Sequence, residues 1–232
     1  MTERVAVDDG GAWNRLVDRR GTGRGDERRN ALLGALEGLL REQGLEQINI
    51  ADISHRAGVT RSAFYFYFES KAIAVMALMQ DLYDAAAAAN ELLENAEGDA
   101  TERFRTSITL LFDSVDSSPH TYRALLEARA SSASVRQMWD AGRVDFASVI
   151  ARMIETERSA GRAGAGPDAG ALASVLLDLN DHALERHSLG SGPPREQHID
   201  TLTFLWLRSI YGSDPLTTDD VRPSRTFRKK QR

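Results

Sequence analysis

Residues 48–71 read INIADISHRAGVTRSAFYFYFESK, and this stretch decides the fold. Asn49 is a favourable N-cap for a short helix, which we expect to end before Gly58. Thr60 is a second N-cap, and the helix that it begins runs through RSAFYFYF. Two short helices joined by a tight turn have the proportions of a helix-turn-helix, a unit that lays its second helix in the major groove of DNA.

Five aromatic side chains occupy positions 64 to 68, out of 16 in the whole chain. Because successive helical residues turn by about 100°, Phe64 and Phe68 share one face, which we expect to be buried. Tyr65 and Tyr67 fall on the two flanks of that face, where their hydroxyls are placed to bind phosphate. Phe66 points away from the buried pair. The pattern therefore predicts two core phenylalanines, two phosphate-binding tyrosines and one exposed phenylalanine.

Other residues of the stretch predict direct contacts with DNA. Arg61 lies at the exposed N-terminal end of the second helix, and arginine is the usual reader of guanine. Ala63 is placed to meet a thymine methyl group, and Lys71, at the start of the next helix, is placed to bind a phosphate. The spacing alone fits a pair of capped helices in an ordinary bundle equally well. The predicted DNA-contacting residues are Asn49, Thr60, Arg61, Ser62, Ala63, Tyr65, Phe66, Tyr67 and Lys71.

The stretch resembles the DNA-binding signature of the TetR family of bacterial transcriptional regulators. Ser62 departs from the wider family, which usually has glycine there, and Phe66 is also unusual, so base preferences do not carry over. The segments FYFYFESK, ARASSASVRQMW, DLND and WLRSIYG are similar to the ethionamide-resistance branch of the family, whose members have a long apolar ligand tunnel. The resemblance implies a C-terminal half that binds a ligand and forms a dimer. The residues that match the family pattern are Gly58, Val59, Thr60, Tyr65, Tyr67, Phe68 and Lys71.

Almost every periodic segment of the chain predicts a helix, and no segment alternates convincingly at the period of a strand. Gly44 is expected to cap the C-terminus of the first helix, and Pro119 suits the first turn of a later one. We therefore expect an all-α fold of about nine helices, near residues 26–43, 50–57, 60–68, 71–96, 104–115, 119–131, 134–162, 168–189 and 194–211.

The expected organisation is a disordered tail (1–25), a helix-turn-helix domain (26–71), a ligand-binding and dimerisation domain (72–212) and a basic disordered tail (213–232). Charge is distributed unevenly over these parts. The first 71 residues carry 11 basic and 11 acidic side chains, residues 72–212 carry 12 and 20, and the last segment carries 6 and 3. A polyanion is therefore repelled by the middle of the chain and tolerated at its ends.

The chain has 232 residues, a formal net charge of −5 and no cysteine. Disulfides, thiol nucleophiles and cysteine-ligated metals are therefore excluded, which fits a reducing compartment. No apolar run is long enough to span a membrane, and the polar N-terminus lacks the apolar core of a signal peptide. We expect a cytoplasmic protein without a cofactor.

Apolar residues of the C-terminal half are candidates for lining a ligand cavity, although ordinary core packing explains any single one of them better. Asn180 is more informative, because its helical neighbours are apolar and a buried amide needs a hydrogen-bond partner. The resemblance implies that a ligand meets this amide, and a structural hydrogen bond is equally consistent. The predicted cavity residues are Phe104, Ile108, Leu111, Val115, Met138, Trp139, Phe146, Leu177, Asn180 and Trp206.

The two last helices, near 168–189 and 194–211, carry more apolar residues than one subunit is expected to bury. We therefore expect them to pair with their copies across a two-fold axis, an arrangement that suits a palindromic DNA site. The apolar residues in question are Leu172, Val175, Leu176, Leu179, Leu202, Leu205 and Ile210.

These observations lead to a ligand-responsive repressor that binds a palindromic operator as a homodimer and is released by an apolar small molecule. An activator or a ligand-independent regulator is the alternative among DNA-binding proteins. A small helical enzyme is the alternative in another class, with His182 and Glu185 as the one plausible acid–base pair. Asp178, His182 and Glu185 also share a helix face, but without further ligands we expect a solvated face and no metal site.

Overall fold

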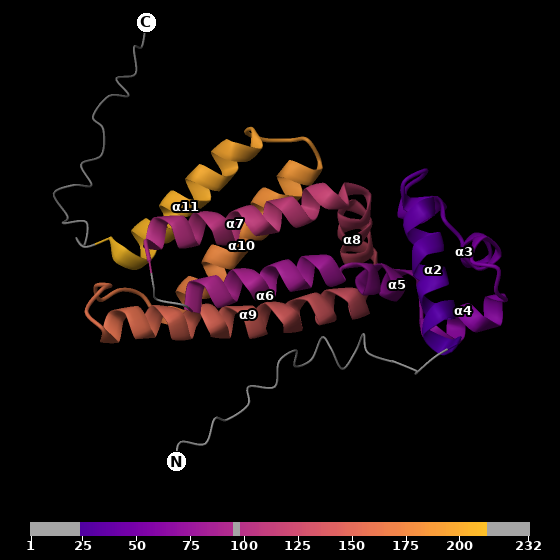
Figure 1. Cartoon of the computed structure of the whole chain (residues 1–232), viewed down its shortest axis with the longest axis horizontal. Helices are drawn as coiled ribbons and strands as arrows, with labels where there is room; N and C mark the ends of the chain where they lie inside the picture. The colour runs from indigo at the N-terminus through magenta and orange to yellow at the C-terminus, as the bar shows by residue number, and fades with distance from the viewer. Residues whose placement is uncertain (1–23, 95–97, 213–232) are drawn as a thin grey trace, which may run out of the picture.

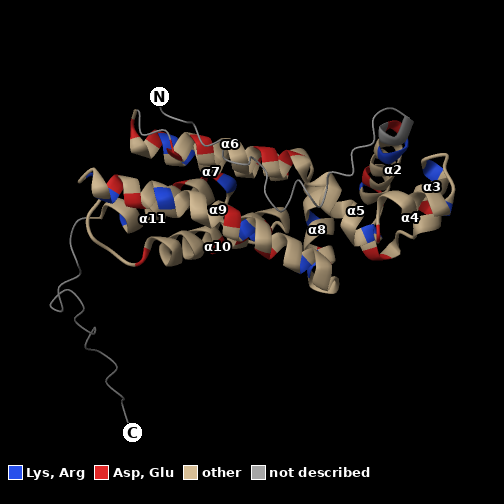
Figure 2. Cartoon of the chain, turned by 90° about the horizontal axis from the view of Figure 1, so that it is seen from below, with Lys and Arg blue, Asp and Glu red and all other residues tan. Residues whose placement is uncertain are grey.

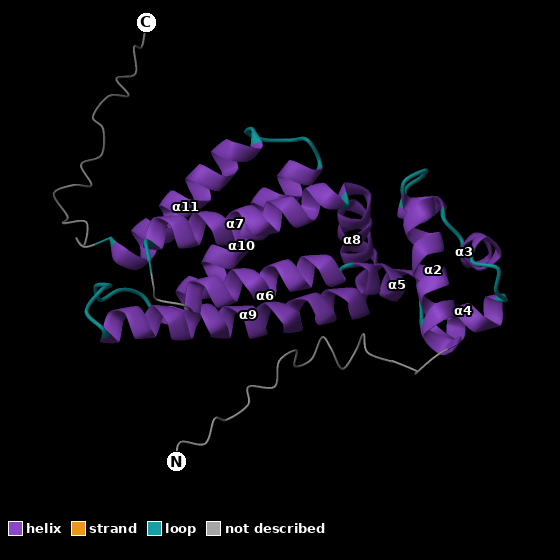
Figure 3. Cartoon of the chain, viewed as in Figure 1, coloured by secondary structure: helices purple, strands orange, loops and turns teal. Residues whose placement is uncertain are grey.

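The computed structural model describes residues 24–94 and 98–212, and this part of the chain is helical, without a strand (Figures 1 and 3). The predicted tails, 1–25 and 213–232, lie outside the described residues, except for the first residues of α2. The helices are α2 (Arg24–Leu40), the 3₁₀ helix η1 (Leu45–Gln47), α3 (Ile50–Arg56), α4 (Arg61–Tyr67), α5 (Lys71–Leu78), α6 (Gln80–Glu94), α7 (Ala100–Ser117), α8 (Pro119–Ser131), α9 (Ala133–Ser159), α10 (Ala169–Ser188) and α11 (Arg195–Tyr211).

Helices α2 to α4 form a compact unit at one end of the molecule (Figure 1). The Asn49 side chain accepts a hydrogen bond from the backbone of Asp52, whose carboxylate accepts one from the backbone of Asn49, so α3 begins with a complete capping box. Gly58 has φ of +65°, a conformation that glycine adopts without strain, and it turns the chain from α3 into α4. Thr60 accepts a hydrogen bond from the backbone of Ala63 and starts α4. The predicted helix-turn-helix is therefore formed by local signals.

Two details of the predicted helices are wrong. Gly44 has φ of −66° and precedes η1, so it is not a left-handed cap of α2, which ends at Leu40. The single helix expected over 71–96 is two helices, because the chain bends by 43° between α5 and α6 at Met79. No proline or glycine marks this bend in the sequence. Splitting this helix raises the count to ten α-helices in the described part of the chain.

The body of the molecule consists of α6, α7, α9, α10 and α11, which run along its length (Figure 1). Helix α6 packs on α7 and α9, α9 packs on α10, and α7 packs on α11. Helix α8 stands across one end of the body and contacts α2, η1 and α5 on one side and α7, α9 and α10 on the other. The unit formed by α2 to α4 is therefore joined to the body through α5 and α8.

Acidic and basic residues are interspersed along these helices (Figure 2). Ion pairs link α7 to α11, where Arg105 pairs with Glu196 and Asp200 and Arg195 pairs with Asp113. Within residues 24–94 and 98–212, no single helix is long and apolar enough to cross a membrane. The bent pair α5 and α6 passes that test only when its two helices are counted together.

Candidate DNA-binding surface and effector cavity

The aromatic residues of α4 divide as the helical spacing predicts. Phe64 is completely buried and Phe68 is 3% exposed, and their rings contact each other at 5.6 Å between centres. Phe66 is 73% exposed and Tyr65 is 48% exposed. Tyr67 is half-buried, and its ring packs edge-to-face with that of Phe66, with 5.0 Å between the ring centres. The helix is therefore anchored by two phenylalanines and presents three other aromatic rings near or at its surface.

Arg61 and Tyr65 lie together on the exposed side of α4. The guanidinium of Arg61 donates to the Tyr65 hydroxyl at 3.4 Å, and its central carbon lies 5.8 Å from the centre of the tyrosine ring. Ser62 is exposed beside them and Ala63 is half-buried. Because Arg61 has five N–H donors, most of its hydrogen-bonding capacity remains for a base edge or a phosphate. Asn49 and Thr60 are also exposed, but their side-chain oxygens already cap α3 and α4.

Lys71, which we expect to bind a phosphate, also has partners within the protein. Its ammonium group is half-buried and donates to two backbone carbonyls, those of Leu45 and, at 2.6 Å, Ile48. Burial lowers the pKa of Lys71, while the nearby carboxylates of Glu127 and Glu46 oppose that shift. An ammonium group has three donors, so one N–H remains for a phosphate. In this structure Lys71 ties α5 to the carbonyl end of η1, which the sequence pattern did not indicate.

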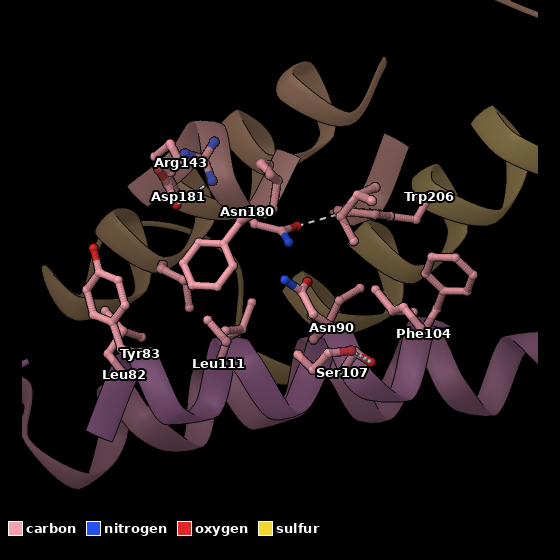
Figure 4. Close-up of a pocket in the computed structure, with 18 of the residues that line it drawn as sticks. Leu82, Tyr83, Asn90, Phe104, Ser107, Leu111, Arg143, Asn180, Asp181 and Trp206 are labelled. Carbon is pink, nitrogen blue, oxygen red and sulfur yellow. Dashed lines mark hydrogen bonds and ion pairs between the residues drawn. The ribbon is translucent and has the colours of Figure 1, made fainter. Parts of the chain in front are cut away.

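A narrow cavity of about 80 Å³ lies inside the body, between α6, α7, α9, α10 and α11 (Figure 4). Its wall is mainly apolar, and Ala86 and Ala89 of α6 leave space that larger side chains would fill. This volume has room for only a few water molecules, whereas sites for drug-sized ligands measure about 300–1,000 Å³. A larger ligand must therefore push its helices apart.

Eight of the ten predicted residues line this cavity: Phe104, Ile108, Leu111, Trp139, Phe146, Leu177, Asn180 and Trp206. The predictions for Val115 and Met138 are wrong. Val115 is buried near the C-terminal end of α7, one turn beyond Leu111, where α7 meets α8. Met138 precedes Trp139 and therefore points about 100° away from it, into other parts of the core.

Asn180 has the partner that a buried amide requires. Its side-chain oxygen accepts a hydrogen bond of 3.0 Å from the indole nitrogen of Trp206, and Asn180 is only 4% exposed. The structural hydrogen bond is therefore present, and it uses only the amide oxygen. The amide nitrogen points into the cavity (Figure 4).

The sequence did not indicate the polar residues that face Asn180 or lie at the end of the cavity. Asn90 of α6 and Ser107 of α7 lie in the middle of the wall, and the Ser107 hydroxyl donates to the backbone oxygen of Ala89 at 3.1 Å. Tyr83, Arg143 and Asp181 lie at one end, away from Phe104 and Trp206 (Figure 4). Asn90 follows a run of alanines, and that interruption of an apolar helix face is the one signal that pointed to it.

Arg143 and Asp181 form an ion pair in the cavity wall. The Arg143 Nε lies 3.2 Å from a carboxylate oxygen of Asp181, and another guanidinium nitrogen lies 2.9 Å from Asp178. Desolvation raises the pKa of Asp181 to about 6, although the charge of Arg143 acts in the opposite direction. Burial also raises the pKa of the Tyr83 hydroxyl, and the negative charge of Asp181 adds to that effect. The ion pair with Arg143 therefore offsets only part of the cost of desolvating the Asp181 carboxylate.

None of Asp178, His182 and Glu185 lines the cavity. The His182 side chain is exposed. Within the described residues, no three side chains of the metal-ligating types come together.

The outer faces of α10 and α11 carry exposed apolar side chains. Val175, Leu179 and Phe204 are 57%, 39% and 58% exposed. Other residues expected on this surface are not available to a second subunit, because Leu176, Leu202 and Ile210 are buried within the chain itself. Leu172 and Leu205 are half-buried at its edge.

Comparison with known proteins agrees with both halves of this structure. The family model described as "Bacterial regulatory proteins, tetR family" matches residues 32–73, and that of "Transcriptional regulator EthR, C-terminal domain" matches residues 104–212. The HTH-type transcriptional regulator EthR of Mycobacterium tuberculosis is 34% identical over 194 residues, which cover 82% of this chain and 90% of that protein. The chain belongs to the TetR family of bacterial transcriptional regulators.

Other TetR-family proteins extend the comparison. The EthR protein of Mycolicibacterium smegmatis is 33% identical over 199 residues, which cover 84% of this chain and 91% of that protein. The crystal structure of a TetR-like regulator from Rhodococcus sp. RHA1 has the same fold, with a TM-score of 0.57 and 16% identity over 78% of this chain and 94% of the other. TetR-family regulators bind DNA operators and ligands, act as dimers, are typically ligand-responsive repressors and are not enzymes.

Proposed function

We propose that this TetR-family regulator represses transcription by binding a palindromic operator as a homodimer, and that an apolar small molecule in the cavity releases it. The observation that carries the proposal is a mainly apolar cavity enclosed by the same helices that position α5 and α8 against the DNA-binding unit. A regulator that acts on bacterial DNA in this way works in the cytoplasm.

The DNA-binding part of the proposal rests on the exposed side of α4. Arg61 is assigned to a base edge, because it lies at the exposed N-terminal end of the helix. Tyr65, Tyr67 and the remaining donor of Lys71 are assigned to phosphates, and Phe66 to a base methyl or sugar. The side chains of Asn49, Thr60, Ser62 and Ala63 complete the contact surface.

The dimer is assigned to the outer faces of α10 and α11. Exposed apolar side chains are costly in water when they form a continuous patch, and Val175, Leu179 and Phe204 lie on these two adjacent helices. Pairing them across a two-fold axis places two copies of α4 in equivalent grooves, which requires a spacing of about 34–36 Å or a multiple of it.

Release follows from the small size of the cavity. A ligand that inserts between Leu82 of α6, Phe104 of α7 and Leu177 of α10 must displace these helices, because the space is too narrow for it. Helix α6 continues through the bend into α5, and Lys71 at the start of α5 holds η1. Displacement of α6 therefore changes the position of α4 relative to its copy.

The test is binding of fluorescent DNA from the protein's own promoter region, measured by anisotropy with and without a panel of apolar compounds. We expect specific binding that falls by at least fivefold when an active compound is present. Promoter binding that no compound weakens would remove the ligand-responsive part of the proposal. Failure to bind this or any genomic fragment would remove the DNA-binding part.

A further inference from the structure

The effector cavity has a charged end that its apolar wall does not explain. Arg143 of α9 and Asp181 of α10 face this end, with 17% and 22% of their side chains exposed. Tyr83 of α6 lies beside them (Figure 4). A hydrocarbon would leave the spare hydrogen-bonding capacity of Arg143 and Asp181 unused at this end, and burying polar groups that lack hydrogen bonds is unfavourable.

The same ion pair separates the cavity from an outer depression between α9 and α10. Four residues line both spaces, namely Trp139, Arg143, Leu177 and Asp181. A molecule that passes between these four side chains reaches from the inner cavity to the surface. Its polar end would then lie at Asp181 and its apolar end near Phe104 and Trp206.

The charges at this end do not favour an anion. The positive charge of Arg143 is already paired with two carboxylates, those of Asp178 and Asp181. A carboxylate has about four lone-pair sites, and Asp181 therefore keeps acceptor capacity. Acidic side chains outnumber basic ones in residues 72–212 by 20 to 12, which repels an anion further.

The middle of the cavity adds a second polar position. The amide groups of Asn90 and Asn180 point into it from opposite sides (Figure 4). The oxygen of Asn180 is occupied by Trp206, and among the described residues the Asn90 side chain has no hydrogen-bond partner. A polar group part-way along a ligand therefore finds donors and an acceptor there.

We propose that the effector is an elongated amphiphile whose hydrogen-bond-donating head, at best a protonated amine, binds Asp181 while its apolar body occupies the cavity toward Trp206. This inference rests on the proposed role of the cavity as the effector site. It makes Asp181 the residue that discriminates between head groups and disfavours carboxylate amphiphiles such as fatty acids.

Arg129 is the cation that an anionic head would use instead. It lines the outer depression, and its guanidinium carbon lies 4.4 Å from the centre of the Trp139 ring. Asp140, Asp178 and Asp181 line the same depression, and their negative charges oppose an anion bound to Arg129. A carboxylate site at Arg129 is therefore the competing arrangement that the experiment must separate.

The experiment titrates the full chain at pH 7.5 with 1-decylamine, 1-decanol and decanoate, which share one chain length and differ in the head. Calorimetry is expected to give the affinity order amine, alcohol, carboxylate, with at least tenfold between the first and the last. Asp181→Asn should weaken the amine about tenfold and leave the alcohol within twofold. Asp178→Asn is the matched control, because Asp178 is 72% exposed and lines only the outer depression, and it should keep the order.

If the wild-type protein binds decanoate as tightly as decylamine, that result is sufficient to overturn the inference, and no variant is needed. A decanoate preference that Arg129→Gln abolishes would replace it with an anion site. An amine preference that survives Asp181→Asn would also overturn it, as would the absence of binding by all three probes. If the probes bind in the expected order but none weakens promoter binding, the head-group preference at Asp181 stands, but the cavity is not the effector site and the proposed function fails. If all three probes bind equally and weaken promoter binding, the proposed function stands and the inference fails.

Discussion

The recognition helix α4 and the effector cavity are both built from aromatic and apolar side chains, but they differ in what surrounds those side chains. At α4 the two inward phenylalanines, Phe64 and Phe68, are buried, and the side chain of Thr60 caps the start of the helix. In the cavity a gap remains, and it is bordered by amides and an ion pair. The difference teaches that α4 is rigidly supported so that it can be positioned, whereas the cavity is left incomplete so that another molecule can move its walls.

The largest expected effect tests the packing of α4. Phe64→Ala removes a completely buried ring, and we expect it to lower the free energy of unfolding by about 3–5 kcal/mol. Phe66→Ala is the matched control, since Phe66 is 73% exposed, and it should stay within about 0.5 kcal/mol of the wild type. Urea denaturation of both variants measures the difference. Equal stability of the two variants would mean that the faces of α4 are not distinct.

The next effect tests the charged end of the cavity through pH. The folded-state pKa of Asp181 is raised from its usual value to about 6, so the folded protein binds this proton more tightly than the unfolded chain does. Stability from this group is therefore present at low pH and is lost as pH rises through about 6. Arg143, Arg129, Tyr83 and Asp178 are the charged or titratable groups that act on it.

Asp181→Asn cannot release this proton. Relative to the wild type, its unfolding free energy should therefore rise by up to about 3 kcal/mol between pH 4 and pH 7. The exposed carboxylate of Asp178 supplies the control, because Asp178→Asn should show a much smaller change relative to the wild type over the same range. Chemical denaturation at several pH values measures both. A flat difference for Asp181→Asn would show that the carboxylate is not desolvated.

Lys71 lies between the recognition helix and the effector cavity, because it connects α5 to the backbone around η1. Its replacement tests that connection. Lys71→Met removes donors from the carbonyls of Leu45 and Ile48, which should destabilise the protein by about 1.5–3 kcal/mol. DNA binding should weaken for all sequences alike, and the dependence of affinity on salt should decrease by about one unit. Lys71→Arg restores a donor and is the control. Wild-type stability of Lys71→Met would mean that the carbonyl contacts are dispensable.

Arg61 tests what α4 displays. Arg61→Ala should cost about 1–3 kcal/mol in operator binding and relax the preference at one position in each half-site. Stability should not change, because the side chain is exposed. Selection of DNA sequences by the wild type and the variant measures the preference. An unchanged preference would assign Arg61 to a phosphate rather than a base.

The recognition helix and the cavity also differ in how much of each can be predicted from the sequence. The caps Asn49 and Thr60, the turn at Gly58 and the buried pair Phe64 and Phe68 depend on residues a few positions apart, so their spacing is sufficient. The apolar wall of the cavity was also predictable, because its residues recur at helical spacing. Arg143 and Asp181 were not, because they come together only when α9 packs on α10.

Other differences have the same cause. The bend at Met79 has no local signal, and the contacts of Lys71 with η1 join residues 23 and 26 positions apart. The burial of Leu176, Leu202 and Ile210 inside the subunit also depends on how the helices pack. Periodicity shows that a helix has an apolar face, but it does not show whether that face meets the same chain or a second copy.

The central claim is that occupation of the cavity and DNA binding oppose each other, and reciprocity gives its most direct measurement. Calorimetry should compare the affinity of 1-decanol for the free protein with its affinity for the protein saturated with promoter DNA. A coupling of about 1–3 kcal/mol predicts that DNA weakens ligand binding by about 5- to 150-fold, and that the ligand weakens DNA binding by the same factor. Equal ligand affinity in the two titrations would contradict the account and leave a DNA-binding protein whose cavity has no regulatory role.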